Sequence, residues 1–187
     1  MVTVNTLRTE VRPCTLPTNR YLEKKSLMKV FLAGIMQGSH REPVLHGQDY
    51  RTRLKQLLSE HLPEAEVYDP LEDHGDSINY NDHKGRDVFF RHNRMCREVD
   101  VVLAFVPEAS MGTAIEMWEA HQNGRAVIAI SPLEHNWSVK FCSHEIYPDV
   151  AAFEAALADG RVRQRVREVL GSRAESRESR VESRGAS

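Results

Sequence analysis

The chain has 187 residues, of which 41% are hydrophobic and 28% charged, a composition typical of one globular domain with room for an extension. Lys and Arg total 25 and Asp and Glu total 27, and this formal charge of −2 argues against a general nucleic-acid-binding protein. No apolar run approaches the roughly 20 residues that span a bilayer, and the N-terminus lacks the apolar segment of a signal peptide. We therefore expect neither a nucleic-acid nor a membrane partner.

The three cysteines are widely spaced and odd in number. Cys14, Cys96 and Cys142 form no Cys-x-x-Cys pair. This usage predicts neither a disulfide framework nor a cysteine zinc site, and it favours a reducing, cytoplasmic setting.

Composition divides the chain into three parts. Residues 1–27 have no sustained hydrophobic period and predict an irregular N-terminal extension. Residues 28–170 carry the pattern of a folded domain. Residues 171–187 repeat Glu-Ser-Arg and contain one aliphatic residue larger than Ala, Val181, so they predict a disordered tail.

Between residues 28 and 170, short apolar runs alternate with stretches of helical periodicity. In chain order the pattern predicts a strand at Lys29–Gly34, a helix at Gln48–His61, a strand at Ala65–Tyr68, a polar loop over 71–83, a helix at Lys84–Glu98, a strand at Val99–Val106, a helix at Met111–Asn123, a strand at Ala126–Ile130, and helices at Asp149–Leu157 and Arg161–Leu170.

Continuous apolar strands separated by helices indicate a parallel sheet that is covered on both faces. The predicted fold class is α/β: a doubly wound, five-stranded parallel sheet in a flavodoxin-like or Rossmann-like three-layer sandwich. In such sheets the ligand lies beyond the carboxyl ends of the strands. The segments predicted there are the loop after Gly34, the turn Pro107–Thr113 and the loop Ser131–Asn136.

The turn before the third predicted helix carries the strongest chemical pattern. Ser110 is suited to cap the helix, and Gly112 allows a ligand to approach the backbone. Free N–H groups and the helix dipole favour an anion at this end. Glu116 lies four residues past Gly112, about 6 Å along the helix axis. One helix end can thus hold a phosphate and place a carboxylate near an anomeric carbon.

The alternative interpretation is a Ser-capped helix with an ordinary surface glutamate. A second glycine-bearing loop at the same sheet edge favours the pocket: Gly34 is followed by Gln37, Gly38 and Ser39. The loop is neither a P-loop nor a dinucleotide-binding Gly-x-Gly-x-x-Gly motif.

Three segments of this chain resemble the nucleoside 2-deoxyribosyltransferase family, most closely the branch that hydrolyses deoxynucleoside 5′-monophosphates. They are Val30–Gly34 with Gln37–Ser39, Asp100–Ala104, and Ser110–Glu116. The resemblance implies that Glu116 is the nucleophile and forms a glycosyl-enzyme intermediate at C1′. It also implies that Ser110 helps to hold a 5′-phosphate, and that the protein is a homo-oligomer acting on a nucleoside or nucleotide without a cofactor.

His92 stands where the family usually has an aspartate that handles the base or its proton. A histidine near neutrality can exchange protons, so His92 is a candidate catalytic residue. The competing interpretation is a histidine satisfied in the core.

Further candidates for substrate binding lie on neighbouring segments. Thr113 follows Gly112, and Asn136 is placed to hydrogen-bond a sugar or base. Asp69 begins a polar segment, Asp69–His83, that is long enough to act as a lid over the substrate. The Asp and His residues in that segment match no metal-ligand spacing, so we expect no metal.

The sequence therefore predicts cleavage of an N-glycosidic bond, by hydrolysis or by 2-deoxyribosyl transfer to another base. Two alternatives remain. A phosphoribohydrolase of the cytokinin-activating type also places Gly-Thr-x-x-Glu at a helix start, but this chain lacks the Pro-Gly-Gly that precedes it there. A non-catalytic nucleotide sensor would use the same pocket.

Overall fold

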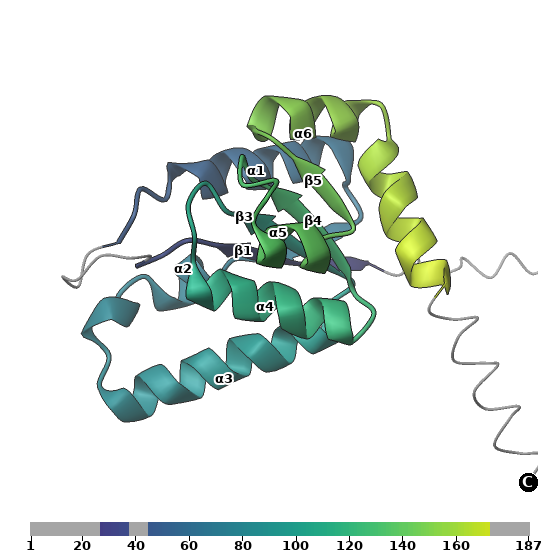
Figure 1. Cartoon of the computed structure of the whole chain (residues 1–187). Helices are drawn as coiled ribbons and strands as arrows, with labels where there is room; N and C mark the ends of the chain where they lie inside the picture. Colours follow the sequence, from purple (N-terminus) through teal and green to yellow (C-terminus); the bar gives the residue numbers. More distant parts are fainter. Residues whose placement is uncertain (1–26, 38–44, 173–187) are drawn as a thin grey trace, which may run out of the picture.

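The computed structural model describes residues 27–37 and 45–172. Five parallel strands form one sheet in the order β2-β1-β3-β4-β5 (Figure 1). Their bounds are β1 Met28–Gly34, β2 Ala65–Tyr68, β3 Val101–Phe105, β4 Ala126–Ile130 and β5 Glu145–Tyr147. The order in which successive strands are added reverses between β1 and β3, which pair in parallel with Gly34 opposite Phe105. The predicted doubly wound parallel sheet is confirmed.

Helices cover both faces of the sheet (Figure 1). On one face lie α1 (Asp49–His61), α6 (Val150–Ala158) and the helical residues 161–172. On the other face lie α3 (Asp82–Glu98), α4 (Met111–Gln122) and α5 (Trp137–Cys142), with α3 packed against α4. The three layers match the predicted sandwich.

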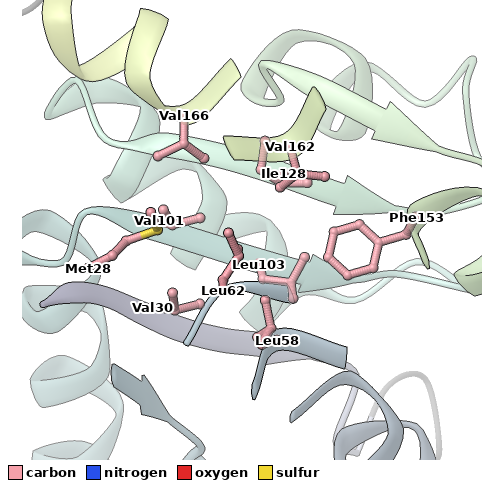
Figure 2. Close-up of a pocket in the computed structure, with 10 residues that line it drawn as sticks. All are labelled: Met28, Val30, Leu58, Leu62, Val101, Leu103, Ile128, Phe153, Val162 and Val166. Carbon is pink, nitrogen blue, oxygen red and sulfur yellow. The ribbon is translucent and has the colours of Figure 1, made fainter. Parts of the chain in front are cut away.

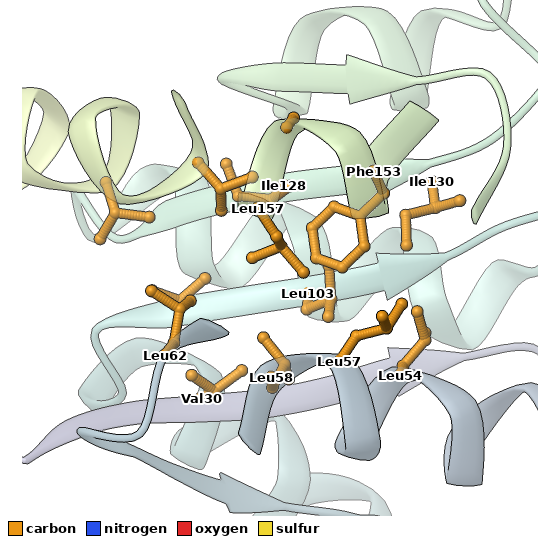
Figure 3. Close-up of a cluster of buried hydrophobic side chains, with 14 of the residues drawn as sticks. Val30, Leu54, Leu57, Leu58, Leu62, Leu103, Ile128, Ile130, Phe153 and Leu157 are labelled. Atoms are coloured by element: carbon orange, nitrogen blue, oxygen red, sulfur yellow. The ribbon is translucent and has the colours of Figure 1, made fainter. Parts of the chain in front are cut away.

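The face under α1 and α6 is filled mainly with aliphatic side chains, together with Phe153 and Tyr147 (Figure 3). Leu103 and Ile128 of the sheet meet Leu58 of α1 and Phe153 of α6. A small cavity remains between the sheet and residues 161–172, and Figure 2 shows that its lining is wholly apolar. It offers no polar group to hold a nucleotide. Val166 packs into this core, so the folded unit extends into the last predicted helix.

The predicted loop over 71–83 is wrong. Residues Pro70–His74 form α2, and Ser77–Asn79 form a 3-10 turn. The Asp69 side chain caps α2 by accepting from the Leu71 N–H at 3.0 Å, and Pro70 occupies the first helical turn, where its missing N–H costs nothing.

Other differences concern short elements and ends. Strand β5 and helix α5 were not located from the sequence, since they have only three and six residues. The last helix runs to residue 172, two residues into the predicted tail. The remaining tail, 173–187, and residues 1–26 lie outside the described part. Within that part, no helix is both long and apolar enough to cross a membrane.

Candidate functional site

A broad cavity opens at the carboxyl ends of β1 and β3, where the strand order reverses. It encloses about 1150 Å³, including space that is open to solvent. Its lining includes polar and titratable side chains and glycine backbone, among them Gly34, Gln37, His74, His92, Ser110 and Glu116. Ligands of open α/β sheets bind at such a switch point. Most of the residues singled out from the sequence are therefore gathered in one place.

The N-terminus of α4 forms one end of this cavity. Ser110 Oγ accepts from the Thr113 N–H at 3.4 Å and from the Thr113 hydroxyl at 3.0 Å. Thr113 is itself buried, so it holds the cap in place rather than facing solvent. No atom approaches within 4 Å of the position that a Cβ on Gly112 would take. The first turn of α4 thus presents open backbone N–H groups and the positive end of a helix dipole.

Glu116 lies one turn further along α4 and lines the same cavity. Its side chain keeps some surface open to the cavity but is surrounded by protein. Desolvation raises the pKa of Glu116 to about 8, and the nearby positive charge of Arg51 opposes this rise. A buried carboxyl group with a strongly perturbed pKa, in a cleft, is typical of a functional site.

Tyr50 of α1 supports the floor of the site. Its ring stacks on Phe105 with centroids 4.2 Å apart, and its hydroxyl donates to the Ile35 carbonyl at 3.4 Å. The tyrosine lies so close to Gly34 that any Cβ at that position would collide with its ring and hydroxyl. Burial raises the pKa of Tyr50 to about 12, so the phenol stays neutral.

Asp69 does not line the cavity, although the sequence marked it as a substrate contact. Both of its side-chain oxygens are occupied: Oδ1 by the Arg51 guanidinium at 2.8 Å and by the α2 cap, and Oδ2 by Lys55 at 3.1 Å. Arg51 is equally buried, and it also donates to the Leu32 carbonyl at 3.0 Å. The structure thus places Asp69 in a buried ion pair behind the site.

His92 lines the same cavity as Ser110. Its Nε2 lies 3.2 Å from the Tyr68 hydroxyl. Desolvation is the main cause that lowers the pKa of His92 to about 4, and the neighbouring His74 adds to this effect. The imidazole is therefore neutral at pH 7. His74 and Tyr80, which complete this wall, were not assigned a binding role from the sequence.

Asn136 lies in a second cavity of about 700 Å³ between α4 and α5. This cavity shares Ser110 and Met111 with the first one. The Asn136 side chain caps α5 by accepting from the N–H groups of Ser138 and Val139. The structure therefore places Asn136 beside the Glu116 cavity rather than in it.

Two candidates, Gly38 and Ser39, fall outside the described residues. Within the described ranges, no group of three or more His, Cys, Asp or Glu side chains is arranged to hold a metal ion.

This architecture is similar to that of a solved 2-deoxyribosyltransferase from the psychrotolerant bacterium Bacillus psychrosaccharolyticus. The TM-score is 0.51 with 19% sequence identity, and the match covers 69% of this chain and 95% of that chain. The chain has the fold of a 2-deoxyribosyltransferase. The resemblance seen in the sequence motifs is thus confirmed at the level of the fold.

A CMP N-glycosidase from Clostridium botulinum is also similar, with a TM-score of 0.42, 21% identity, and coverage of 70% of this chain and 98% of that chain. No family model and no curated protein matches the sequence. The deoxyribosyltransferase fold is therefore established by structure, and the role of each residue rests on the geometry of the cavity.

Proposed function

We propose that this protein is an enzyme that cleaves the N-glycosidic bond of a nucleoside 5′-monophosphate or a nucleoside, with Glu116 as the nucleophile. The observation that carries the proposal is the position of Glu116, in a switch-point cavity and one helical turn from an uncovered helix N-terminus. The rise from Gly112 to Glu116 is about 6 Å, close to the span between a 5′-phosphate and C1′ of a pentose.

The chemistry needs two steps at C1′. In the first, Glu116 loses its proton to solvent, and an oxygen of the resulting carboxylate bonds to C1′ while the C1′–N bond breaks and its electron pair leaves with the base. In the second, water or a second base attacks C1′ and releases the carboxylate. Water as acceptor makes the enzyme a hydrolase, and a base as acceptor makes it a transferase.

The α4 end of the cavity supports a 5′-monophosphate as the substrate. Ser110 offers a hydroxyl, and the open backbone at Gly112 offers N–H donors to an anion. The cavity is also lined by the neutral His92 and by the aromatic rings of Tyr80 and Phe89, which suit a planar base. The substrate then lies with its phosphate at Ser110, its sugar over Glu116 and its base at His92.

The test is a chromatographic assay of ribo- and deoxynucleosides and their 5′-monophosphates, with and without an added free base. Glu116→Gln is expected to lose at least ~10³-fold in turnover, because an amide cannot serve as the nucleophile. The matched control is Glu119→Gln. This glutamate lies on the same helix but pairs with Arg97 at 2.7 Å, outside the cavity.

Release of free base that is lost in Glu116→Gln and kept in Glu119→Gln supports the proposal, and a base swapped into the product identifies a transferase. Equal turnover in wild type and Glu116→Gln would disprove the nucleophile. Nucleotide binding without turnover would favour the sensor. Turnover restricted to ribonucleoside monophosphates, with ribose 5-phosphate as product, would favour the phosphoribohydrolase.

We also infer that the protein is a cytoplasmic homo-oligomer. Large apolar side chains on α4 and α5 are exposed, among them Met111 at 84%, Trp118 at 50% and Trp137 at 77%. Apolar surface of this kind favours a protein interface. Light scattering after size-exclusion chromatography measures the mass directly, and a monomer at micromolar concentration would disprove the oligomer.

A further inference from the structure

Two histidines and two tyrosines contact one another at the cavity that contains Glu116. The Tyr80 hydroxyl lies 3.1 Å from His74 Nδ1, and the Tyr68 hydroxyl lies 3.2 Å from His92 Nε2. The two imidazole centroids are 5.2 Å apart. Each histidine is thus held at one nitrogen by a tyrosine and faces the other histidine.

One ring nitrogen of His74 makes no hydrogen bond to the described residues. This atom, Nε2, is buried. Buried polar atoms are normally paired, so an unpaired one indicates strain, an absent water or a catalytic role. The imidazole rings of His74 and His92 are tilted by 60° at a centroid separation of 5.2 Å, close enough for a rotation of one ring to bring a nitrogen of His92 within hydrogen-bond distance of His74 Nε2.

We propose that His74 is a positioning residue that acts with His92 as a coupled pair, taking up one proton and passing it to the departing base. Protonated His92 donates to the vacant Nε2 of neutral His74, and this contact holds the proton at the base end of the cavity. The inference rests on the proposed function, since it assigns the acid for the same bond cleavage.

The surroundings limit the pair to a single proton. The groups that face His92 are Tyr68 of β2, Asp73 and His74 of α2, and Arg91 of its own helix. Asp73 favours a proton on His92, whereas Arg91 and a charged His74 oppose it. Two imidazolium ions this close repel each other, so the second proton is excluded. Tyr80 faces His74, and Glu116 lines the same cavity.

The proton balance closes over one turnover. The pair takes its proton from solvent and gives it to the base nitrogen as the C1′–N bond breaks, so the base leaves neutral. In hydrolysis, the water that attacks C1′ returns a proton to the pair as its oxygen bonds to carbon. No oxidant, metal or further reactant is needed.

The first test is an NMR titration of the histidine ring signals in the full-length protein without substrate. If His74 accepts from protonated His92, replacing it with phenylalanine lowers the pKa of His92 by about one unit, because a hydrogen bond to the charged form is lost. If the two rings only repel, His74→Phe raises that pKa, and the proposal fails. His74→Gln, which keeps an acceptor, is expected to restore part of the wild-type value. Signals of the folded protein in each variant confirm that the ring change did not unfold it.

The second test compares the best substrate of the assay above with an analogue whose base carries a ring fluorine and leaves more readily. His74→Phe is expected to lower kcat/KM at least ~10-fold for the natural base and less than ~3-fold for the analogue, since a good leaving group needs little protonation. Equal losses for both would contradict a proton-transfer role. His83→Gln is the control, because His83 is exposed on α3.

The two failures can be told apart. If no substrate is cleaved by the wild-type protein, the proposed function fails, while the NMR titration still decides whether the histidines share a proton. If the wild type cleaves a nucleotide, and His74→Phe changes neither the pKa of His92 nor kcat/KM, the proposed His74–His92 pair is disproved. The proposed role of Glu116 as the nucleophile is then unaffected.

Discussion

Two carboxyl groups lie in the interior of this molecule, and their surroundings differ. Asp69, at the corner of β2, α1 and α2, is fully buried, but Arg51, Lys55 and a backbone N–H satisfy both of its oxygens. Glu116, on α4, lines the cavity, and the positive charge of Arg51 favours its ionised form without outweighing the effect of burial. The carboxylate of Asp69 is thus paired with positive charges and hydrogen-bond donors. The carboxyl group of Glu116 has no such partner among the described residues and faces a cavity that a substrate can reach.

The difference indicates where the molecule accepts a cost in stability. Buried charges are tolerated when they are paired and hydrogen-bonded, and an unpaired one is costly. A buried carboxyl group without a partner therefore indicates a functional site, whereas a buried carboxylate in an ion pair does not.

Replacing Asp69 with alanine should have the largest effect. The substitution leaves the Arg51 guanidinium buried without its partner and uncaps α2, and a loss of about 3–5 kcal/mol in the free energy of unfolding is expected. Urea unfolding at pH 7 measures it. A loss below about 1 kcal/mol would show that the corner is not held by this ion pair.

Glu116→Gln should instead stabilise the protein, and the effect should depend on pH. The folded protein keeps a proton on Glu116 up to about pH 8, while the unfolded chain loses it near 4.5. The folded state thus binds more protons between these values, and wild-type stability falls as pH rises through this window. The glutamine variant lacks that fall, so it should exceed the wild type by ~1–3 kcal/mol at pH 8.5.

The same substitution should change little at pH 4, where both states of the wild type are protonated at this position. Thermal unfolding of the wild type and of Glu116→Gln at pH 4 and pH 8.5 distinguishes an effect of the Glu116 charge from an effect of packing. An equal difference at both values would mean that the effect comes from packing and not from the charge of Glu116.

Ser110→Ala should cost about 1 kcal/mol of stability through the lost helix cap, and should also weaken binding of a 5′-monophosphate. Asp149→Ala is the matched control, since Asp149 caps α6 in the same way, accepting from the Ala152 N–H at 2.8 Å. Both variants should lose similar stability, and only Ser110→Ala should raise KM. A raised KM in both would place the effect in the fold and not in the site.

Arg53→Ala should have the smallest effect. Arg53 pairs with Glu154 at 2.7 Å, but both side chains are about two-fifths exposed, so solvent screens the pair. A loss of at most ~0.5 kcal/mol is expected. Urea unfolding beside Asp69→Ala gives the contrast between an exposed and a buried ion pair, and comparable losses would overturn it.

The sequence predicted the parts of this molecule that depend on local pattern. The strand at Val101–Phe105 is apolar on both faces, and Ser110 and Glu116 share one helix at a readable spacing. The segment after Asp69 was assigned to a loop because its composition is polar. The Asp-Pro pair at its start is nevertheless typical of a helix N-terminus.

The missing parts of the site depend on contacts between distant residues. Arg51 and Asp69 are 18 positions apart, and nothing in their spacing predicts that they pair. His74 meets His92 across a similar separation, and its unpaired nitrogen is visible only when the neighbouring atoms are in place. Sequence reasoning therefore placed Asp69 against the substrate and left His74 without a role.

The close approach of Tyr50 to Gly34 has a consequence for how this protein can vary in evolution. Any side chain at position 34 needs the space that the Tyr50 ring now occupies, so the two positions can change only together. A protein with alanine at the first position should carry a smaller residue at the second. This linked pair, 16 residues apart, gives a way to recognise distant relatives whose overall sequence identity is too low to detect them.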